Sequence, residues 1–193
     1  ADTTAVEDSL YTYHARASDQ DTALFGDVVR YRLSVKPSWL VIDSITGTVS
    51  GTPVGLNARD TVAAVQSYDN KGGVSTQSFT LRVEHVNHEP EFISTPVTAA
   101  QEDSLYKYQV IATDADQQLF GDQLQYKLNV RPVWMQIDSV TGLITGVPVG
   151  KDVGDTVVTV RVRDGKGGSV VQTFAVTVSH TNHAPQFTTG PDT

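Results

Sequence analysis

The two halves of this chain are copies of each other. The 193 residues align with themselves at an offset of 95 residues without a gap, and about half of the paired positions are identical. EDSLYTY at 7–13 returns as EDSLYKY at 102–108, and H-x-N-H-x-P-x-F at 85–92 returns at 180–187. Because every turn has kept its length, the chain is predicted to hold two copies of one fold.

The repeat also predicts where the copies begin and end. We expect the first domain at 1–92, ending in a linker at 85–92, and the second at 93–187. Pro90 stiffens the linker, because its fixed φ and missing N–H resist strand pairing. Residues 188–193 are expected to open a third repeat. The start at Ala1, without an initiator Met or an apolar signal segment, is expected of a processed fragment.

Apolar residues alternate with a period of two in three segments of each copy, as in half-buried strands. No segment has a helical period of useful length. Asp, Asn, Lys and Gly residues between two such runs predict a hairpin turn in each copy. The strand segments are 11–17, 29–35 and 77–83, with counterparts at 106–112, 124–130 and 172–178, and the turns are 69–73 and 164–168. The pattern predicts an all-β fold of two tandem Greek-key β-sandwiches.

The aromatic residues are assigned to the two cores. Trp39 and Trp134 stand at equivalent positions and are predicted to pack between sheets rather than to stack on a ligand, because a buried aromatic removes a large area from water. The paired tyrosines are also placed inside. Phe25 and Phe120, in the two LFGD segments, are assigned to the cores as well.

Charge and motif content exclude several functions. The net charge of −8 argues against nucleic-acid binding, which needs clustered Lys and Arg, and favours cations as partners. The chain has no cysteine, and it has no apolar run long enough for direct membrane insertion. Motifs of hydrolases, metalloproteases and nucleotide-binding enzymes are missing, so we expect no catalytic residues and no enzyme activity.

The order of the motifs resembles the dystroglycan-type cadherin-like repeat of surface proteins. The resemblance covers nearly the whole chain, twice, and implies that each β-sandwich is cadherin-like or Ig-like. It is carried by an early Glu, a D-x-D, a P-x-W-x-x-I-D-x-x-T-G-x-x-x-G-x-P series, a turn with two Gly and a closing N-x-x-P. One departure is notable. Where the family usually has Asp after the linker Asn, this chain has His88 and His183.

The resemblance implies Ca²⁺ bound at the junctions of consecutive repeats. Ca²⁺ takes six to eight oxygen ligands, and several carboxylates held together repel one another without a cation. The implied interdomain ligands are Glu7, Asn87, Asp114, Asp116 and Asp164. An equivalent site toward a preceding repeat would use Asp19, Asp21 and Asp69, and one toward a following repeat would use Glu102 and Asn182.

Two alternatives remain for these polar residues. The acidic side chains can instead cap solvated turns through Asx-turns. The H-x-N-H segments contain imidazoles suited to Zn²⁺ or Cu²⁺. In an extended linker, however, residues three apart are expected to point to opposite faces, so we interpret these histidines as polar linker side chains. A neutral imidazole at His88 is also a poor Ca²⁺ ligand.

The sequence therefore predicts a calcium-stiffened adhesion or spacer segment of a larger extracellular protein, secreted or on the cell surface. Its partners would be neighbouring repeats of the same chain, together with a homophilic partner or a polysaccharide. The alternative is a carbohydrate-binding module of a secreted polysaccharide-active or adhesive protein. Exposed flat aromatic rings would favour that alternative.

Overall fold

The computed structural model describes residues 3–188 of the chain, which divides into two compact units, 1–86 and 87–193. In both units the regular structure is mainly β-strand, with only short helical turns, so the all-β prediction is confirmed. Of the segment predicted to open a third repeat, residues 189–193 lie outside the described part. Within residues 3–188, no helix is long and apolar enough to cross a membrane.

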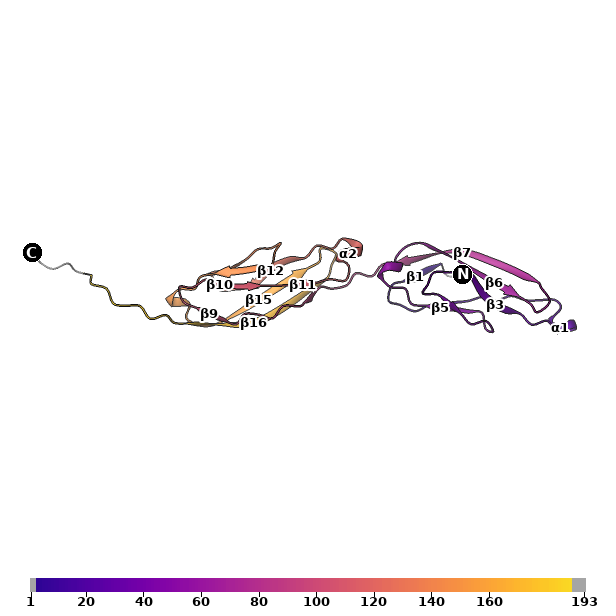
Figure 1. The fold of residues 1–193 in the computed structure, drawn as a ribbon, viewed down its shortest axis with the longest axis horizontal. Coiled ribbons are helices and arrows are strands. Elements are labelled where there is room, and N and C mark those ends of the chain that lie inside the picture. Colours follow the sequence, from indigo (N-terminus) through magenta and orange to yellow (C-terminus); the bar gives the residue numbers. More distant parts are fainter. Residues whose placement is uncertain (1–2, 189–193) are drawn as a thin grey trace, which may run out of the picture. The chain divides into compact units, whose positions relative to one another are not determined.

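The first unit contains two sheets (Figure 1). One has the order β1-β7-β6-β3 and the other the order β2-β5-β4. The first strand of the larger sheet, β1, pairs in parallel with the last strand, β7. The strands are β1 (Thr4–Val6), β2 (Tyr11–His14), β3 (Arg30–Val35), β4 (Val41–Ile42), β5 (Thr48–Gly51), β6 (Thr61–Tyr68) and β7 (Val74–Glu84), with a helical turn α1 (Thr22–Phe25) and a 3-10 turn (Gly55–Asn57).

The second unit repeats this plan with orders β9-β16-β15-β12 and β10-β14-β13, and adds a short β8-β11 pair. The antiparallel hairpin of β15 and β16 is its longest ladder. The strands are β8 (Glu91–Phe92), β9 (Ala99–Gln101), β10 (Tyr106–Gln109), β11 (Ala112–Thr113), β12 (Gln125–Val130), β13 (Met135–Ile137), β14 (Leu143–Gly146), β15 (Gly154–Arg163) and β16 (Ser169–Ser179), with α2 (Gln117–Phe120) and a 3-10 turn (Gly150–Asp152).

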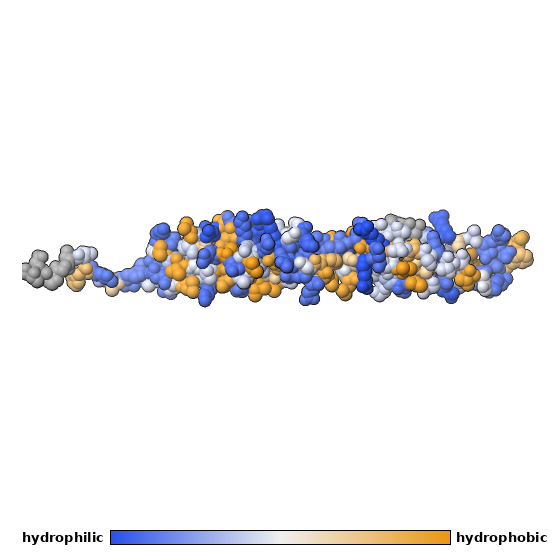
Figure 2. All heavy atoms as spheres, turned by 90° about the horizontal axis from the view of Figure 1, so that it is seen from above, coloured by the Kyte–Doolittle hydropathy of each residue, from blue (hydrophilic) through white to orange (hydrophobic). Residues whose placement is uncertain are grey.

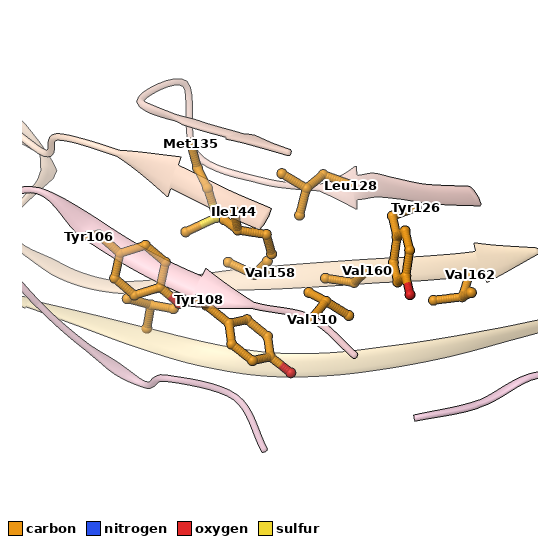
Figure 3. Close-up of a cluster of buried hydrophobic side chains, with 11 residues drawn as sticks. Tyr106, Tyr108, Val110, Tyr126, Leu128, Met135, Ile144, Val158, Val160 and Val162 are labelled. Carbon is orange, nitrogen blue, oxygen red and sulfur yellow. The ribbon is translucent and has the colours of Figure 1, made fainter. Parts of the chain in front are cut away.

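The two larger sheets of each unit enclose an apolar core, drawn for the second unit in Figure 3. Tyr106 packs edge-on against Trp134, with 5.7 Å between ring centroids, and Tyr11 meets Trp39 in the same way. The prediction that both tryptophans belong to the cores is confirmed. Gly146 lies so close to the backbone of Trp134 that an added Cβ would sit 2.1 Å from the Trp134 carbonyl oxygen. Glycine is therefore required at this position, where β14 passes beside the Trp134 backbone.

The LFGD segments differ from their prediction. Each forms a single helical turn, α1 or α2, closed by a glycine in the left-handed conformation. Phe25 is 66% exposed, so its assignment to the core is wrong. One turn of helix carries too few residues to show a helical period, and the short turn points the Phe25 ring away from the sandwich. Phe120 is half-buried.

Apolar residues also occur on the surface. On the face shown in Figure 2, hydrophobic side chains are scattered among hydrophilic ones rather than gathered into one continuous patch. The large exposed hydrophobic residues among the described positions are mostly Val, Leu and Ile. Singly exposed aliphatic residues are normal on protein surfaces and need no functional explanation.

Candidate metal site

The loops at one end of the second unit bring acidic residues together. Asp114 follows β11, Asp122 stands shortly before β12, and Asp164 follows β15. Because β12 and β15 pair antiparallel, with Gln125 opposite Arg163, the start of one strand lies beside the end of the other. The backbone N–H of Gln123 donates to the carbonyl of Asp164 at 3.3 Å, which closes this end.

These three carboxylates form a compact, buried cluster. Asp114, Asp122 and Asp164 each offer an oxygen, and the three oxygens lie within 4.8 Å of one another. The residues are only 7%, 5% and 1% exposed, respectively. Buried carboxylates are rarely left unpaired, because the charged form loses its hydration. We refer to these residues, together with Asn87, as the acidic end cluster.

Several oxygens of the acidic end cluster have no hydrogen-bond donor. Both carboxylate oxygens of Asp122, Oδ2 of Asp114 and Oδ1 of Asn87 are buried without a hydrogen-bond partner. A buried acceptor without a donor costs free energy, and an oxygen-seeking cation is one group that would satisfy it. All four atoms are carboxylate or amide oxygens, the ligand type that Ca²⁺ prefers. The donor set therefore fits Ca²⁺.

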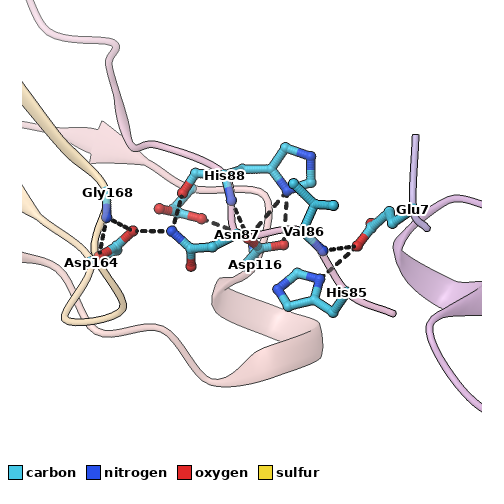
Figure 4. A network of polar contacts seen from close by, with 9 residues as sticks. Glu7, His85, Val86, Asn87, His88, Asp116, Asp164 and Gly168 are labelled. Carbon is cyan, nitrogen blue, oxygen red and sulfur yellow. Dashed lines mark hydrogen bonds and ion pairs between the residues drawn. The ribbon is translucent and has the colours of Figure 1, made fainter. Parts of the chain in front are cut away.

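Local hydrogen bonds hold the members of the cluster in place. Asp164 accepts three backbone N–H groups of its own turn, including that of Gly168 (Figure 4). The Asn87 side chain donates to Asp164 Oδ2 at 2.7 Å, and Asp114 Oδ1 accepts the N–H of Asp116 at 2.8 Å. A Cβ at Gly168 would lie 2.2 Å from Asp164 Oδ2, so this turn needs glycine there.

The electrostatics separate two of these carboxyl groups. Burial, followed by the neighbouring carboxylates, raises the pKa of Asp122, against the opposing effect of Lys166. Burial alone would also raise the pKa of Asp164, but hydrogen bonds from Asn87 and from the turn N–H groups lower it below its usual value. The surroundings thus favour ionisation of Asp164 and disfavour ionisation of Asp122, although Lys166 opposes the second effect.

Asp116 interacts with the linker. Its carboxylate accepts the backbone N–H of His88 at 2.7 Å, and both of its oxygens lie 3.2 Å from His88 Nδ1 (Figure 4). Asp116 is 2% exposed. The linker residues Asn87 and His88 therefore pack on the second unit, and the four predicted ligands Asn87, Asp114, Asp116 and Asp164 lie at the same end of that unit.

The fifth predicted ligand, Glu7, belongs to the first unit. There it is 2% exposed, accepts the N–H of Val86 at 3.0 Å and lies 2.6 Å from His85 Nδ1 (Figure 4). Its predicted convergence with the residues of the second unit stays a prediction. Of the pair predicted to face a following repeat, Glu102 is buried and Asn182 is exposed.

The first unit carries a more open version of the acidic end cluster. Asp19, Asp21 and Asp27 each offer an oxygen within 4.8 Å of the others, but Asp19 is half-buried and Asp21 is exposed. Lys71 forms an ion pair with Asp27 at 3.2 Å. Asp69 accepts backbone N–H groups of Lys71 and Gly73, as Asp164 does in the second unit. The predicted ligand role of Asp19, Asp21 and Asp69 stays a prediction.

Sequence reasoning missed Asp27 and Asp122 as members of these clusters. Both close the LFGD segment of their repeat, in which the sequence predicts a place only for the Phe residue. Their recurrence at the same place in both copies was an available signal. Nothing local marks them as ligands, because they approach the other carboxylates only through the pairing of β3 with β6 and of β12 with β15.

The sequence matches one family model twice, over residues 1–84 and 89–179; its description is "Putative Ig domain". The chain belongs to this family. Tandem Ig-like repeats are thereby confirmed, whereas the dystroglycan type stays a prediction. A comparison with curated proteins finds no match.

Two solved structures are similar to these Ig-like repeats. The match with mouse cadherin-23 EC22-24 covers 80% of this chain and 53% of the cadherin chain, with 20% sequence identity and a TM-score of 0.48. An endo-fucoidan hydrolase from glycoside hydrolase family 107 matches 93% of this chain and 28% of its own, with 20% identity and a TM-score of 0.41. The Ig-like repeats thus span about half of the first protein and about a quarter of the second. At these identities the likeness is one of fold alone.

Proposed function

We propose that the chain is a non-catalytic, calcium-binding spacer or adhesion segment of a larger extracellular protein. The observation that carries this proposal is the acidic end cluster of the second unit. It contains three buried carboxylates and four buried oxygens without donors. Membership of an Ig-like family supports a role in spacing or binding.

Within the proposed site, each residue has a distinct task. Asp122 and Asp114 would supply the carboxylate oxygens that lack donors, and Asn87 would supply its amide oxygen. Asp164 would place a carboxylate that its own turn keeps ionised. Bound Ca²⁺ supplies positive charge that offsets the repulsion among these groups. Because Asn87 belongs to the linker, the ion would tie the linker to the second unit, and the resemblance adds Glu7 of the first repeat as a further ligand.

The expected energetic effect is modest but sufficient for a spacer. Calcium sites of extracellular modules have dissociation constants of roughly 10⁻⁴ to 10⁻³ M. At a tenfold excess of Ca²⁺ over the dissociation constant, binding stabilises the bound state by about 1.4 kcal/mol. This shifts the equilibrium between a fixed and a free linker by roughly tenfold, so that a string of repeats becomes stiffer when Ca²⁺ is present.

A calcium titration of the full chain tests the proposal. The metal-free chain is titrated with CaCl₂ by isothermal calorimetry, and thermal melting and X-ray scattering are compared with and without EDTA. We expect Asp164→Asn to weaken binding at least tenfold. Asp155→Asn removes the same charge from a residue outside the acidic end cluster, whose carboxylate accepts the Thr177 hydroxyl, and should leave binding unchanged. Equal heats, melting curves and dimensions with and without Ca²⁺ in the wild type would reject calcium binding.

The carbohydrate-binding alternative has weaker support. Trp39 and Trp134 pack against the cores rather than forming flat platforms. Among the described residues, the strongly exposed aromatic rings are Phe25 and Phe187. Affinity electrophoresis on a panel of soluble glycans tests this alternative, and retardation that Phe25→Ala abolishes would revive it.

A further inference from the structure

The second unit carries another group of ligating side chains, which the proposed calcium site does not use. It lies where β9 and β16 end. Because β9 pairs in parallel with β16, Gln101 lies opposite Ser179 and both strands end at the same place. The Glu102–Asp103 turn therefore meets the segment that contains His180 and His183. The 11 residues of β16 separate this place from the acidic end cluster by roughly 35 Å.

Backbone contacts fold that segment onto the turn. The N–H of Glu102 donates to the carbonyl of Ser179 at 2.9 Å. In return, the N–H of Thr181 donates to Glu102 Oε2 at 3.0 Å, and the Thr181 hydroxyl donates to the Glu102 carbonyl at 3.0 Å. Thr181 is thus attached at two points, and the chain on either side of it passes over the turn.

Each histidine consequently meets one of the two carboxylates of the turn. His180 Nδ1 lies 2.6 Å from Glu102 Oε2, and His183 Nε2 lies 2.7 Å from Asp103 Oδ2. The two imidazole rings are 6.2 Å apart between centroids. Our expectation that histidines three apart would point to opposite faces is wrong here, because contacts with the turn bend the segment out of a straight extended path.

The ligand types differ from those of the calcium site. Glu102, Asp103 and His183 each offer one ligand atom, and the three atoms lie within 4.8 Å of one another. One imidazole with two carboxylates suits Zn²⁺ and similar divalent ions rather than Ca²⁺, which selects oxygen alone. Zn²⁺ binds N and O ligands at about 2.0–2.2 Å, so tetrahedral ligand atoms lie about 3.3–3.5 Å apart. The distance from His183 Nε2 to Asp103 Oδ2, now 2.7 Å, would therefore need to increase by roughly 0.6 Å.

Burial and exposure also suit a metal site. The Glu102 side chain is 6% exposed and is fixed by two donors, whereas the side chains of Asp103 and His183 are 49% and 59% exposed. A cation can therefore reach the group from solvent and meet one ligand already held in place. His180 contacts the Glu102 carboxylate and can orient it, as neighbouring polar groups orient the ligands of many metal sites.

We propose that this end of the second unit binds Zn²⁺ or a similar divalent cation through Glu102, Asp103 and His183. His180 positions the Glu102 carboxylate, and water completes the coordination, as in zinc sites with three protein ligands. The ion would fix the segment that follows β16 against the turn that follows β9. The site shares no residue with the acidic end cluster, although the resemblance implies Glu102 as a calcium ligand toward a following repeat.

The experiment uses the full chain and Zn²⁺ alone, followed by NMR of the histidine rings. The chain has five histidines, so each ring can be followed separately. His14 lies on β2, where its ring contacts the Thr48 hydroxyl of β5, and serves as an internal control. We expect the His183 and His180 signals to move with one common dissociation constant while His14 stays still. A millimolar excess of Ca²⁺ should leave these shifts unchanged, so that failure here and failure of the calcium proposal are distinguishable.

Two variants sharpen the test. His183→Ala and Asp103→Asn should each weaken Zn²⁺ binding at least tenfold, as followed by the NMR signal of the His180 ring. Asp103 has φ +60°, a conformation that Asn tolerates well, so Asp103→Asn removes charge without straining the turn. His14→Ala is the matched control. Shifts of His180 and His183 that merely follow those of His14 in the wild type would overturn the proposal, as would a His180 shift that keeps its full affinity in both variants.

Discussion

Asp122→Asn should make the second unit more stable without calcium and less responsive to it. Both oxygens of Asp122 are buried without donors, and burial among other carboxylates raises its pKa. A folded-state pKa above the unfolded value means that the ionised group opposes folding, and that this opposition fades as pH falls through the folded pKa. Asn removes the charge at nearly constant shape, so the melting temperature in EDTA should rise at neutral pH.

The calcium response should change in the opposite direction. With Ca²⁺ at 100 times the dissociation constant, the wild type gains about 2.7 kcal/mol. For a domain of about 100 residues this raises the melting temperature by about 10 °C or more. If loss of one carboxylate ligand weakens binding about 100-fold, the same Ca²⁺ concentration equals the new dissociation constant and adds only about 0.4 kcal/mol, or about 2–3 °C.

Differential scanning calorimetry in EDTA and in CaCl₂ measures both effects on the full chain. The transition of the second unit is identified with Met135→Ala, which empties a fully buried position of that unit. Asp155→Asn is the matched control and should keep the calcium response of the wild type. A lower melting temperature of Asp122→Asn in EDTA, together with an undiminished calcium response, would refute the reasoning, because it would make Asp122 a stabilising residue outside the site.

Three further outcomes follow from the structure. Met135→Ala should lower the free energy of unfolding of the second unit by about 2–5 kcal/mol in chemical denaturation, because its side chain is fully buried; a loss under 1 kcal/mol would contradict the core assignment. Gly146→Ala should destabilise the same unit by about 1–3 kcal/mol or more, because the added Cβ would meet the Trp134 carbonyl oxygen. Gly121 has open space around it, so Gly121→Ala should cost only the backbone strain of a positive φ. The N–H groups of Thr141 and Val140 hold the pKa of Asp138 below its usual value. The ionised carboxylate therefore stabilises the fold above the unfolded pKa, and this stabilisation is lost as pH falls through the folded pKa. The difference in stability between the wild type and Asp138→Asn should disappear in acid, and a difference that stays constant with pH would argue against this linkage.

Much of the architecture follows from the residues alone. The 95-residue offset and the period-two alternation predicted two all-β copies, because a half-buried strand must alternate its side chains whatever it pairs with. The turn at Asp69 to Gly73 was predictable for the same local reason, since Asp caps its own turn and Gly accepts unusual backbone angles. Trp39 and Trp134 also packed as predicted.

The composition of the two sites was decided by strand pairing. Asp122 joins Asp164, 42 positions later in the sequence, only because β12 lies antiparallel to β15. His183 meets Asp103, 80 positions earlier, only because β9 lies parallel to β16 and Thr181 is bonded to Glu102. Local sequence shows which residue types are available and which face of a strand they occupy. The distance between ligands that are far apart in the chain depends on which strands become neighbours, and the hydrogen-bond ladders of the folded sheets set that.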